Sequence, residues 1–142
     1  MSDKKRRDIP RFETPIIETH CHLDYLEQVE LDIALEKSRQ AGVERIITVA
    51  VAPGNLNRVM ELTRYSPAIW GSQGIHPHEA ESYNREIDEI IRSNSTDARI
   101  LAVGEIGLDY HYDHADRSVQ RLVFEQQLQT AAELKLPVII HT

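Results

Sequence analysis

A chain of 142 residues is long enough for one domain with a hydrophobic core, and its formal charge of −7 argues against a broad basic surface for nucleic acid. Its single cysteine permits no disulfide within the chain, which favours a reducing compartment such as the cytoplasm. No apolar run reaches membrane-spanning length, and the basic residues near Met1 are not followed by the apolar stretch of a signal peptide. We therefore expect a cytoplasmic domain without a membrane partner.

Short apolar strands and helices alternate along the chain after a polar N-terminal tail at residues 1–14. We expect residues 15–142 to form one domain. Its predicted elements are a strand at 15–19, a helix at 30–41, a strand at 43–50, a helix that carries Leu56 to Leu62, a strand at 68–75, a helix at 85–93, a strand at 100–106, a helix at 118–134 and a strand at 137–140. This alternation has no hairpin signal, so it predicts an α/β fold with a parallel sheet and right-handed crossovers.

Histidines and one glutamate stand where these strands end. They are His20, His22, His76, His78, Glu105 and His141. The carboxyl ends of parallel strands meet at one face of a barrel, where imidazole and carboxylate groups gather divalent metals. Metal ions would supply the positive charge that this acidic chain lacks.

The first pair is His20 and His22, separated by Cys21. In a strand, side chains two residues apart point the same way, so both imidazoles would face one side and Cys21 the other. The pair predicts a chelating site for one ion, and the alternative is two polar residues at a strand end that are solvated or bonded to loop carbonyls. Cys21 is better interpreted as a small buried apolar residue than as a ligand or nucleophile.

The second pair is His76 and His78 on either side of Pro77. The proline favours extended backbone at His76 and stiffens the segment. Such a segment could aim an imidazole at a phosphate, or it could be a rigid turn with two exposed histidines. The later segment from His111 to His114 predicts a solvated loop.

Glu105 ends an apolar strand between Gly104 and Gly107, where an ionised side chain is hard to explain as core. It needs a metal or a cationic partner, and a salt bridge to lysine or arginine is the alternative. His141 follows the next strand and should lie at the same end of the sheet. The coincidence of several such residues, more than any single motif, predicts a metal site.

Four segments carry a resemblance to a known family. They read ETHCHLD at 18–24, GIHPH at 74–78, GEIGLDY at 104–110, and QQ…LKLPVIIH at 126–141. In order and spacing they resemble the successive signatures of the TatD family of metal-dependent deoxyribonucleases. The resemblance implies a parallel (β/α) barrel of TIM type with strands 1–5 of eight present. It also implies hydrolysis of phosphodiester bonds in DNA.

The resemblance implies a site with two divalent metal ions, which could be Zn, Mg, Mn or Co. Its implied ligands are His20, His22, Glu105 and His141. His20 and His22 would hold the first ion, His141 the second, and Glu105 would bridge both as the catalytic residue. His76 would approach the substrate phosphate, and Asp109 would support the ligands without binding an ion.

The family pattern continues after the fifth strand with another histidine ligand and an aspartate that serves as base. We therefore expect either a truncated chain or a barrel completed by another chain, with low nuclease activity for this chain alone. Open sheet edges would also favour self-association. The alternatives are an amidohydrolase-type enzyme that cleaves C–N bonds or lactones, and an inactive fragment that acts as an assembly module.

Overall fold

The computed structural model describes residues 7–142, so the first six residues of the predicted tail lie outside the described residues. Residues 7–14 are exposed and contain no helix or strand. Within residues 7–142, no helix is both long and apolar enough to cross a membrane.

Strands and α-helices alternate as the sequence predicts. They are β1 (Ile16–Cys21), α1 (Gln28–Gln40), β2 (Val43–Thr48), α2 (Leu56–Tyr65), β3 (Ile69–Gln73), α3 (Arg85–Asn94), β4 (Ile100–Gly107), α4 (Arg117–Leu134) and β5 (Val138–His141). Three short 3₁₀ helices were not predicted as such: η1 (Leu23–Tyr25), η2 (Pro53–Asn55) and η3 (Pro77–Ser82).

Local hydrogen bonds explain where the element ends differ from prediction. α1 begins two residues early because Glu27 and Glu30 form a capping box, in which the Glu27 amide donates to Glu30 Oε2 at 3.0 Å. β2 ends before Ala50, whose amide donates to Ser72 Oγ at 3.2 Å instead of to a strand partner. α4 begins at Arg117 because the Asp116 side chain accepts from the first free amides of the helix.

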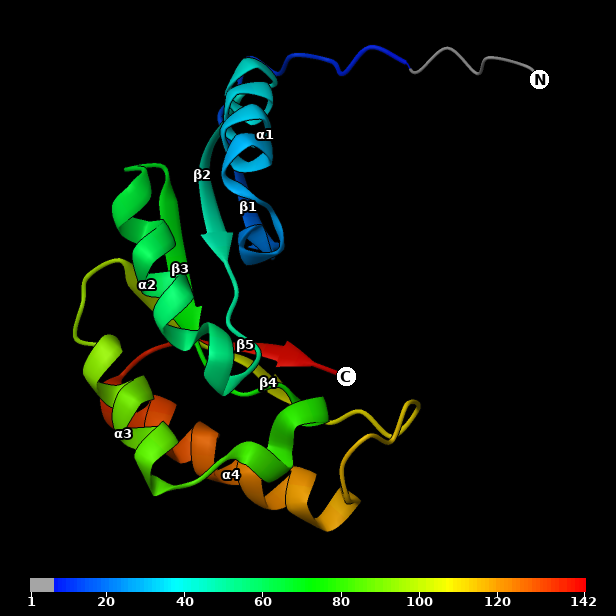
Figure 1. Cartoon of the computed structure of the whole chain (residues 1–142), viewed down its shortest axis with the longest axis vertical. Coiled ribbons are helices and arrows are strands. Elements are labelled where there is room, and N and C mark those ends of the chain that lie inside the picture. Colours follow the sequence, from blue (N-terminus) through cyan, green and yellow to red (C-terminus); the bar gives the residue numbers. More distant parts are fainter. Residues whose placement is uncertain (1–6) are drawn as a thin grey trace.

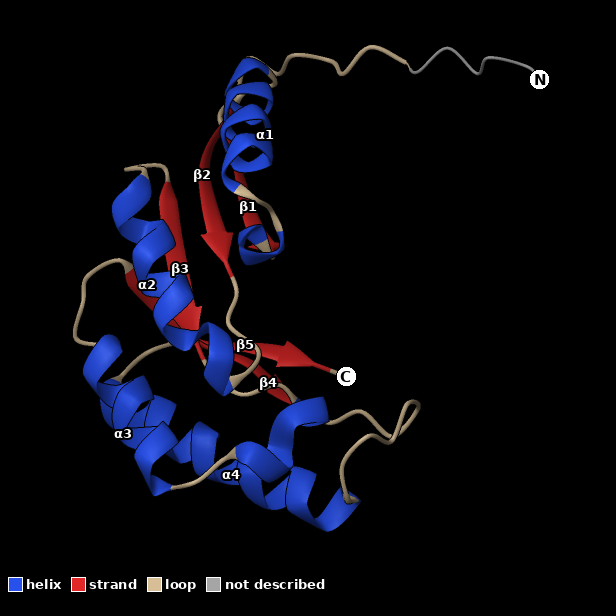
Figure 2. Ribbon diagram, viewed as in Figure 1, coloured by secondary structure: helices blue, strands red, loops and turns tan. Residues whose placement is uncertain are grey.

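The five strands form one parallel sheet in the order β1-β2-β3-β4-β5. Figure 1 shows the strand direction turning from β1 to β5, so that the sheet curls into a half-barrel. Helices flank the strands, with α3 and α4 beside β4 and β5 (Figure 2). In this arrangement β1 and β5 are the edges of the sheet.

The core lies between the sheet and its helices. Val59 of α2, Ile69 of β3 and Val103 of β4 are fully buried, as strands and helices of a covered parallel sheet require. Toward the edges the sheet is more open. Ile17 of β1 is 53% exposed and Ile140 of β5 is 45% exposed.

Two glycines let β5 approach β4 closely. A Cβ atom at Gly104 would lie 2.6 Å from Cβ of Ile139, and one at Gly107 would lie 2.0 Å from the carbonyl oxygen of His141. Gly107 also has a φ of +147°, which side-chain-bearing residues rarely adopt. The close approach positions His141 next to Glu105, which connects the fold to the candidate site.

Candidate metal centre

The carboxyl ends of the strands bring ionisable side chains together in two groups. One group consists of His20, His22 and Glu105, and the other of His76, His78 and His141. Within each group, one nitrogen or oxygen atom from every residue lies within 4.8 Å of those of the others. Residues far apart in sequence therefore meet at the strand ends, as the alternation of strands and helices predicts.

The first group is built around the end of β1. The Glu18 side chain accepts a hydrogen bond from the His20 amide at 2.9 Å, which fixes the backbone at this position. β1 extends to Cys21, two residues beyond the predicted strand, so His20 lies in the strand and His22 just after it, before η1. The ring of His22 is nevertheless anchored, with Nδ1 3.3 Å from the carbonyl oxygen of Val49.

Cys21 points away from this group. Its sulfur lies 3.6 Å from the carbonyl oxygen of Ile47, and it packs against the cluster that contains Leu23 and Ile46. Burial, with smaller contributions from nearby carboxylates, raises the pKa of the thiol to about 12. The cysteine is therefore a neutral packing residue at physiological pH, as predicted.

Glu105 belongs to the first group, also reaches histidines of the second, and is only 6% exposed. Its Oε2 is 3.4 Å from Nε2 of His20, and its Oε1 is 2.9 Å from Nδ1 of His141. Oε1 also lies 4.0 Å from Nε2 of His76. In residues 7–142 the ion pairs of Glu105 are with histidines alone, so the alternative of a lysine or arginine partner has no support.

Asp109 is a second buried carboxylate, two residues beyond β4. Its Oδ2 lies 2.8 Å from Nε2 of His141 and 2.8 Å from Nε2 of His78, while Oδ1 accepts from the Tyr112 amide at 3.0 Å. The Tyr112 amide and then the two imidazoles hold the pKa of Asp109 well below its usual range. Asp109 is therefore an anion that orients both rings.

His76 is 9% exposed and His78 is partly exposed at the start of η3. The Nδ1 atom of His76 accepts a hydrogen bond from the His78 amide at 3.0 Å. Burial is the main cause that lowers the pKa of His76 to about 4, so this ring is neutral at pH 7. The hydrogen bond assigns the remaining proton of His76 to Nε2.

The sequence did not assign His78 to the site. The signal was present, because His76 and His78 repeat the spacing of His20 and His22, but the intervening proline equally suited an exposed turn. The structure brings the His78 ring to Asp109 and within 4.3 Å of the His76 ring centroid. A hollow of about 200 Å³ opens among these groups and is lined by His22, Tyr25, Val51, His76, His78, Glu79 and Glu105.

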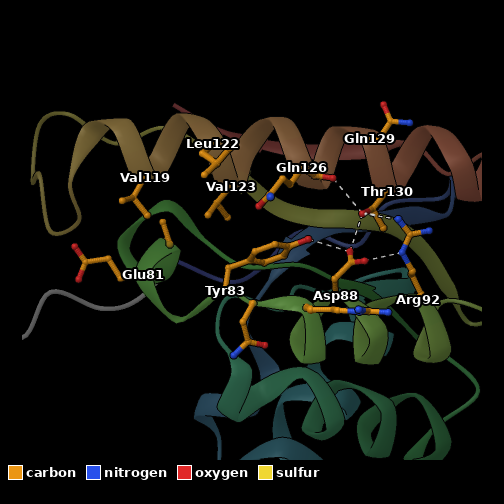
Figure 3. Close-up of a pocket in the computed structure, with 13 residues that line it drawn as sticks. Glu81, Tyr83, Asp88, Arg92, Val119, Leu122, Val123, Gln126, Gln129 and Thr130 are labelled. Atoms are coloured by element: carbon orange, nitrogen blue, oxygen red, sulfur yellow. Dashed lines mark hydrogen bonds and ion pairs between the residues drawn. The ribbon is translucent and has the colours of Figure 1, made fainter.

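A larger hollow of about 570 Å³ lies elsewhere, between η3, α3 and α4. Figure 3 shows Asp88 among the side chains of Tyr83, Arg92 and Thr130 that line this hollow. Tyr83 and Thr130 donate to Asp88 Oδ1 at 2.9 and 2.7 Å, and Arg92 Nε donates to Oδ2 at 2.7 Å. Arg92 also pairs with Glu133 at 2.6 Å, so one arginine serves two carboxylates of this groove.

Comparison with known proteins identifies the class to which this fold and these side chains belong. The family described as "TatD related DNase" matches residues 17–142. The chain therefore belongs to the TatD family, as its sequence motifs predict.

Curated relatives carry two kinds of description. The chain is 34% identical over 128 residues to "Uncharacterized metal-dependent hydrolase YabD" of Bacillus subtilis, covering 89% of this chain and 50% of that protein. It is 31% identical over 110 residues to "3'-5' ssDNA/RNA exonuclease TatD" of Cronobacter sakazakii, covering 78% of this chain and 42% of the relative. The chain spans about half the length of the curated relatives it matches.

Solved structures agree with the fold. The TatD homologue YjjV of Escherichia coli K12 superposes with a TM-score of 0.78 at 33% identity, covering 88% of this chain and 49% of that one. A TatD family hydrolase of Entamoeba histolytica gives a TM-score of 0.78 at 18% identity and supports the fold alone. The prediction of a partial TIM-type barrel is confirmed.

Proposed function

We propose that this chain carries a binuclear divalent metal site that hydrolyses phosphodiester bonds of DNA. The observation that supports the proposal most directly is the position of Glu105, whose two carboxylate oxygens face different histidine groups. Among residues 7–142 the ion-pair partners of this buried carboxylate are histidines, which can balance its charge by taking up a proton or by binding a metal ion with it. The histidine and carboxylate donors suit Zn²⁺, Mn²⁺ or Co²⁺, with Mg²⁺ preferring the oxygens.

His20, His22 and Glu105 would hold the first ion. The Val49 carbonyl can only accept, so Nδ1 of His22 carries its proton and Nε2 keeps a free lone pair. A histidine ligand is commonly oriented in this way, by a hydrogen bond from its other nitrogen. The donor set therefore fits a metal ion without rearrangement of the His22 tautomer.

Glu105 and His141 would hold the second ion. The anionic Asp109 accepts from Nε2 of His141, which leaves the Nδ1 lone pair directed at Glu105 Oε1 across 2.9 Å. Two acceptors at this distance repel each other unless a proton or a metal cation lies with them. Asp109 is thus a positioning residue, because it fixes the ring orientation and tautomer of His141.

His76 suits the binding of substrate better than the binding of metal. Ligation through Nε2 would move its proton to Nδ1, where it would oppose the His78 amide. Neutral His76 instead offers an Nε2–H donor beside Glu105, in reach of an oxygen of a phosphate placed there. When bound, two divalent ions would lower the pKa of a water nucleophile and neutralise developing negative charge.

The sheet edges support a further proposal, that copies of this chain associate. β1 and β5 offer unpaired backbone groups next to the exposed side chains of Ile17 and Ile140, and such edges pair readily. Light scattering should give a mass above that of the monomer, and Ile140→Lys should lower it toward the monomer. Leu122→Lys on α4, which is also exposed, is the matched control. A concentration-independent monomeric mass for the native chain would contradict this proposal.

The lone cysteine is the basis on which we propose a cytoplasmic setting for the protein.

The test of the enzymatic proposal combines metal content with cleavage of a labelled single-stranded oligonucleotide and of plasmid DNA. Cleavage should require added Mn²⁺ or Mg²⁺ and should disappear in Glu105→Gln. A metal-loaded chain that leaves both substrates intact, yet hydrolyses amides or lactones, would overturn the choice of DNA as substrate.

A further inference from the structure

The loop between β4 and α4 places exposed rings beside the candidate metal centre. Tyr112 is 64% exposed, and its ring lies parallel to that of His114, with 2° between planes and 6.0 Å between centroids. The same loop reaches the site, because the His114 and Tyr112 centroids lie 4.6 and 5.8 Å from that of His78. We call the faces of Tyr112 and His114 the aromatic face.

The aromatic face is held in place by the site itself. The Tyr112 amide donates to Asp109, the carboxylate that also orients His78 and His141. At the other end of the loop, Arg117 Nε pairs with Asp113 at 3.1 Å. These contacts hold the loop that carries the rings, which lowers the conformational entropy that a ligand must remove when it binds.

Charge decides which ligand chemistry suits the aromatic face. The segment from Leu108 to Asp116 contains two tyrosines, two histidines and three aspartates but no lysine or arginine. The next cation, Arg117, is already engaged with Asp113 and with the Tyr110 ring, 4.5 Å from its guanidinium. A surface of this kind offers π-faces in place of phosphate contacts, and nucleobases bind such faces by stacking.

We propose that the aromatic face stacks a nucleobase of a single-stranded nucleic acid whose phosphate lies at the metal centre. The proposal rests on the proposed phosphodiesterase function and adds the residues that would hold a base of the substrate. Bases inside a duplex are stacked on their neighbours, whereas unpaired bases expose the face that Tyr112 can cover. Stacking tolerates any base, so the aromatic face adds affinity for single strands without sequence preference.

Binding of oligothymidylate to the full chain tests the proposal. Fluorescence anisotropy is measured in Mg²⁺ with a labelled phosphorothioate strand, which resists cleavage, and with an abasic strand of equal length. Tyr112→Ala should weaken oligothymidylate binding roughly 5- to 150-fold, the range for loss of one base stack. Tyr112→Phe should bind as the native chain does, and the abasic strand should bind native and Tyr112→Ala chains equally.

Tyr65→Ala is the matched control, because Tyr65 is another exposed tyrosine, at the end of α2 that precedes β3. It should leave oligothymidylate affinity unchanged. Unchanged affinity in Tyr112→Ala, an equal loss on the abasic strand, or no binding by the native chain would overturn the proposal. Photocrosslinking of a 5-iodouracil strand should label the peptide that contains Tyr112, and labelling confined to other peptides would count against it.

These outcomes separate the aromatic face from the enzymatic proposal. Binding that depends on Tyr112 without any cleavage of an ordinary phosphodiester strand would refute the hydrolytic function and leave base stacking intact. Cleavage of single strands with the same KM in native and Tyr112→Ala chains would refute base stacking alone.

Discussion

The candidate metal centre and the groove between α3 and α4 both gather ionisable side chains, but their carboxylates have different partners. In the groove, Asp88 meets Arg92, and Arg92 also meets Glu133, so each anion has a cation from the same chain. At the strand ends, Glu105 and Asp109 are nearly buried and their ion pairs are with histidines. The comparison teaches that hollow size alone does not single out the candidate site: the carboxylates of the larger hollow contact an arginine, whereas those of the smaller one contact histidines, which can also bind a metal.

Removal of the central carboxylate should give the largest effect. Glu105→Ala should lower divalent metal affinity by more than about 100-fold, beyond the cost of losing a residue that only supports a ligand. The reason is that, in the proposed site, one side chain would serve both ions. Calorimetric titration with Mn²⁺ and metal analysis after dialysis would measure the loss.

The groove provides the control for this variant. Asp88→Asn removes a carboxylate of similar connectivity and should leave metal stoichiometry unchanged. Wild-type stoichiometry in Glu105→Ala, or equal metal loss in both variants, would remove the distinction between the two regions.

The two histidines of the first group should act as one chelate. His20→Ala and His22→Ala should each weaken the same ion, and the double variant should lose much less affinity than the sum of the two losses in free energy. Non-additivity of this kind is expected for residues that share a ligand. A double-mutant cycle by calorimetry measures it, and simple additivity would argue for separate ions.

The groove between α3 and α4 should affect the stability of the fold and not the binding of metal. Asp88→Asn should lower the free energy of unfolding by about 1–3 kcal/mol, because a carboxylate with three donors is replaced by a neutral amide. Glu89→Gln, in the solvent-exposed pair with Arg85, should change it by less than about 1 kcal/mol. Urea denaturation of the native, Asp88→Asn and Glu89→Gln chains measures both changes. Equal stabilities would show that the hydrogen bonds of Asp88 contribute nothing to stability.

The smallest expected effect is the pH dependence of the stability difference between the native chain and Asp88→Asn. Burial alone raises the pKa of Asp88, but hydrogen bonds from Arg92, Thr130 and Tyr83 outweigh it and leave the pKa below its ordinary value. The stabilisation is therefore complete above the unfolded-state pKa of about 4 and is lost as pH falls through the lower folded-state pKa. The stability difference between native and Asp88→Asn chains should be smaller at low pH than at pH 7, and a constant difference would contradict the assignment.

The two regions also differ in how far the sequence predicts them. The strand-end residues follow from topology, because parallel strands bring His20, Glu105 and His141 to one end of the sheet. The role of Asp109 came only through family resemblance, and its contacts with His78 and Tyr112 depend on a loop conformation that periodicity does not encode. The groove was not predicted, because the contact of Asp88 with Thr130 joins residues 42 positions apart on two helix faces.

The sequence pattern also did not determine which groups balance the charge of Glu105. A glutamate at the end of an apolar strand predicts a cation but not its source, and only the packed structure shows histidines around Glu105. The early start of α1 is a milder case, in which the capping residues Glu27 and Glu30 were visible but outweighed by the apolar pattern that begins at Leu31.

Anomalous diffraction from crystals of this chain grown with Mn²⁺ tests the central claim most directly. We predict two peaks that share Glu105, one beside His20 and His22 and the other beside His141, with none in the groove at Asp88. Peaks remote from Glu105, or a fully ordered strand-end cluster without manganese at saturating concentration, would contradict the assignment of this cluster as the metal centre.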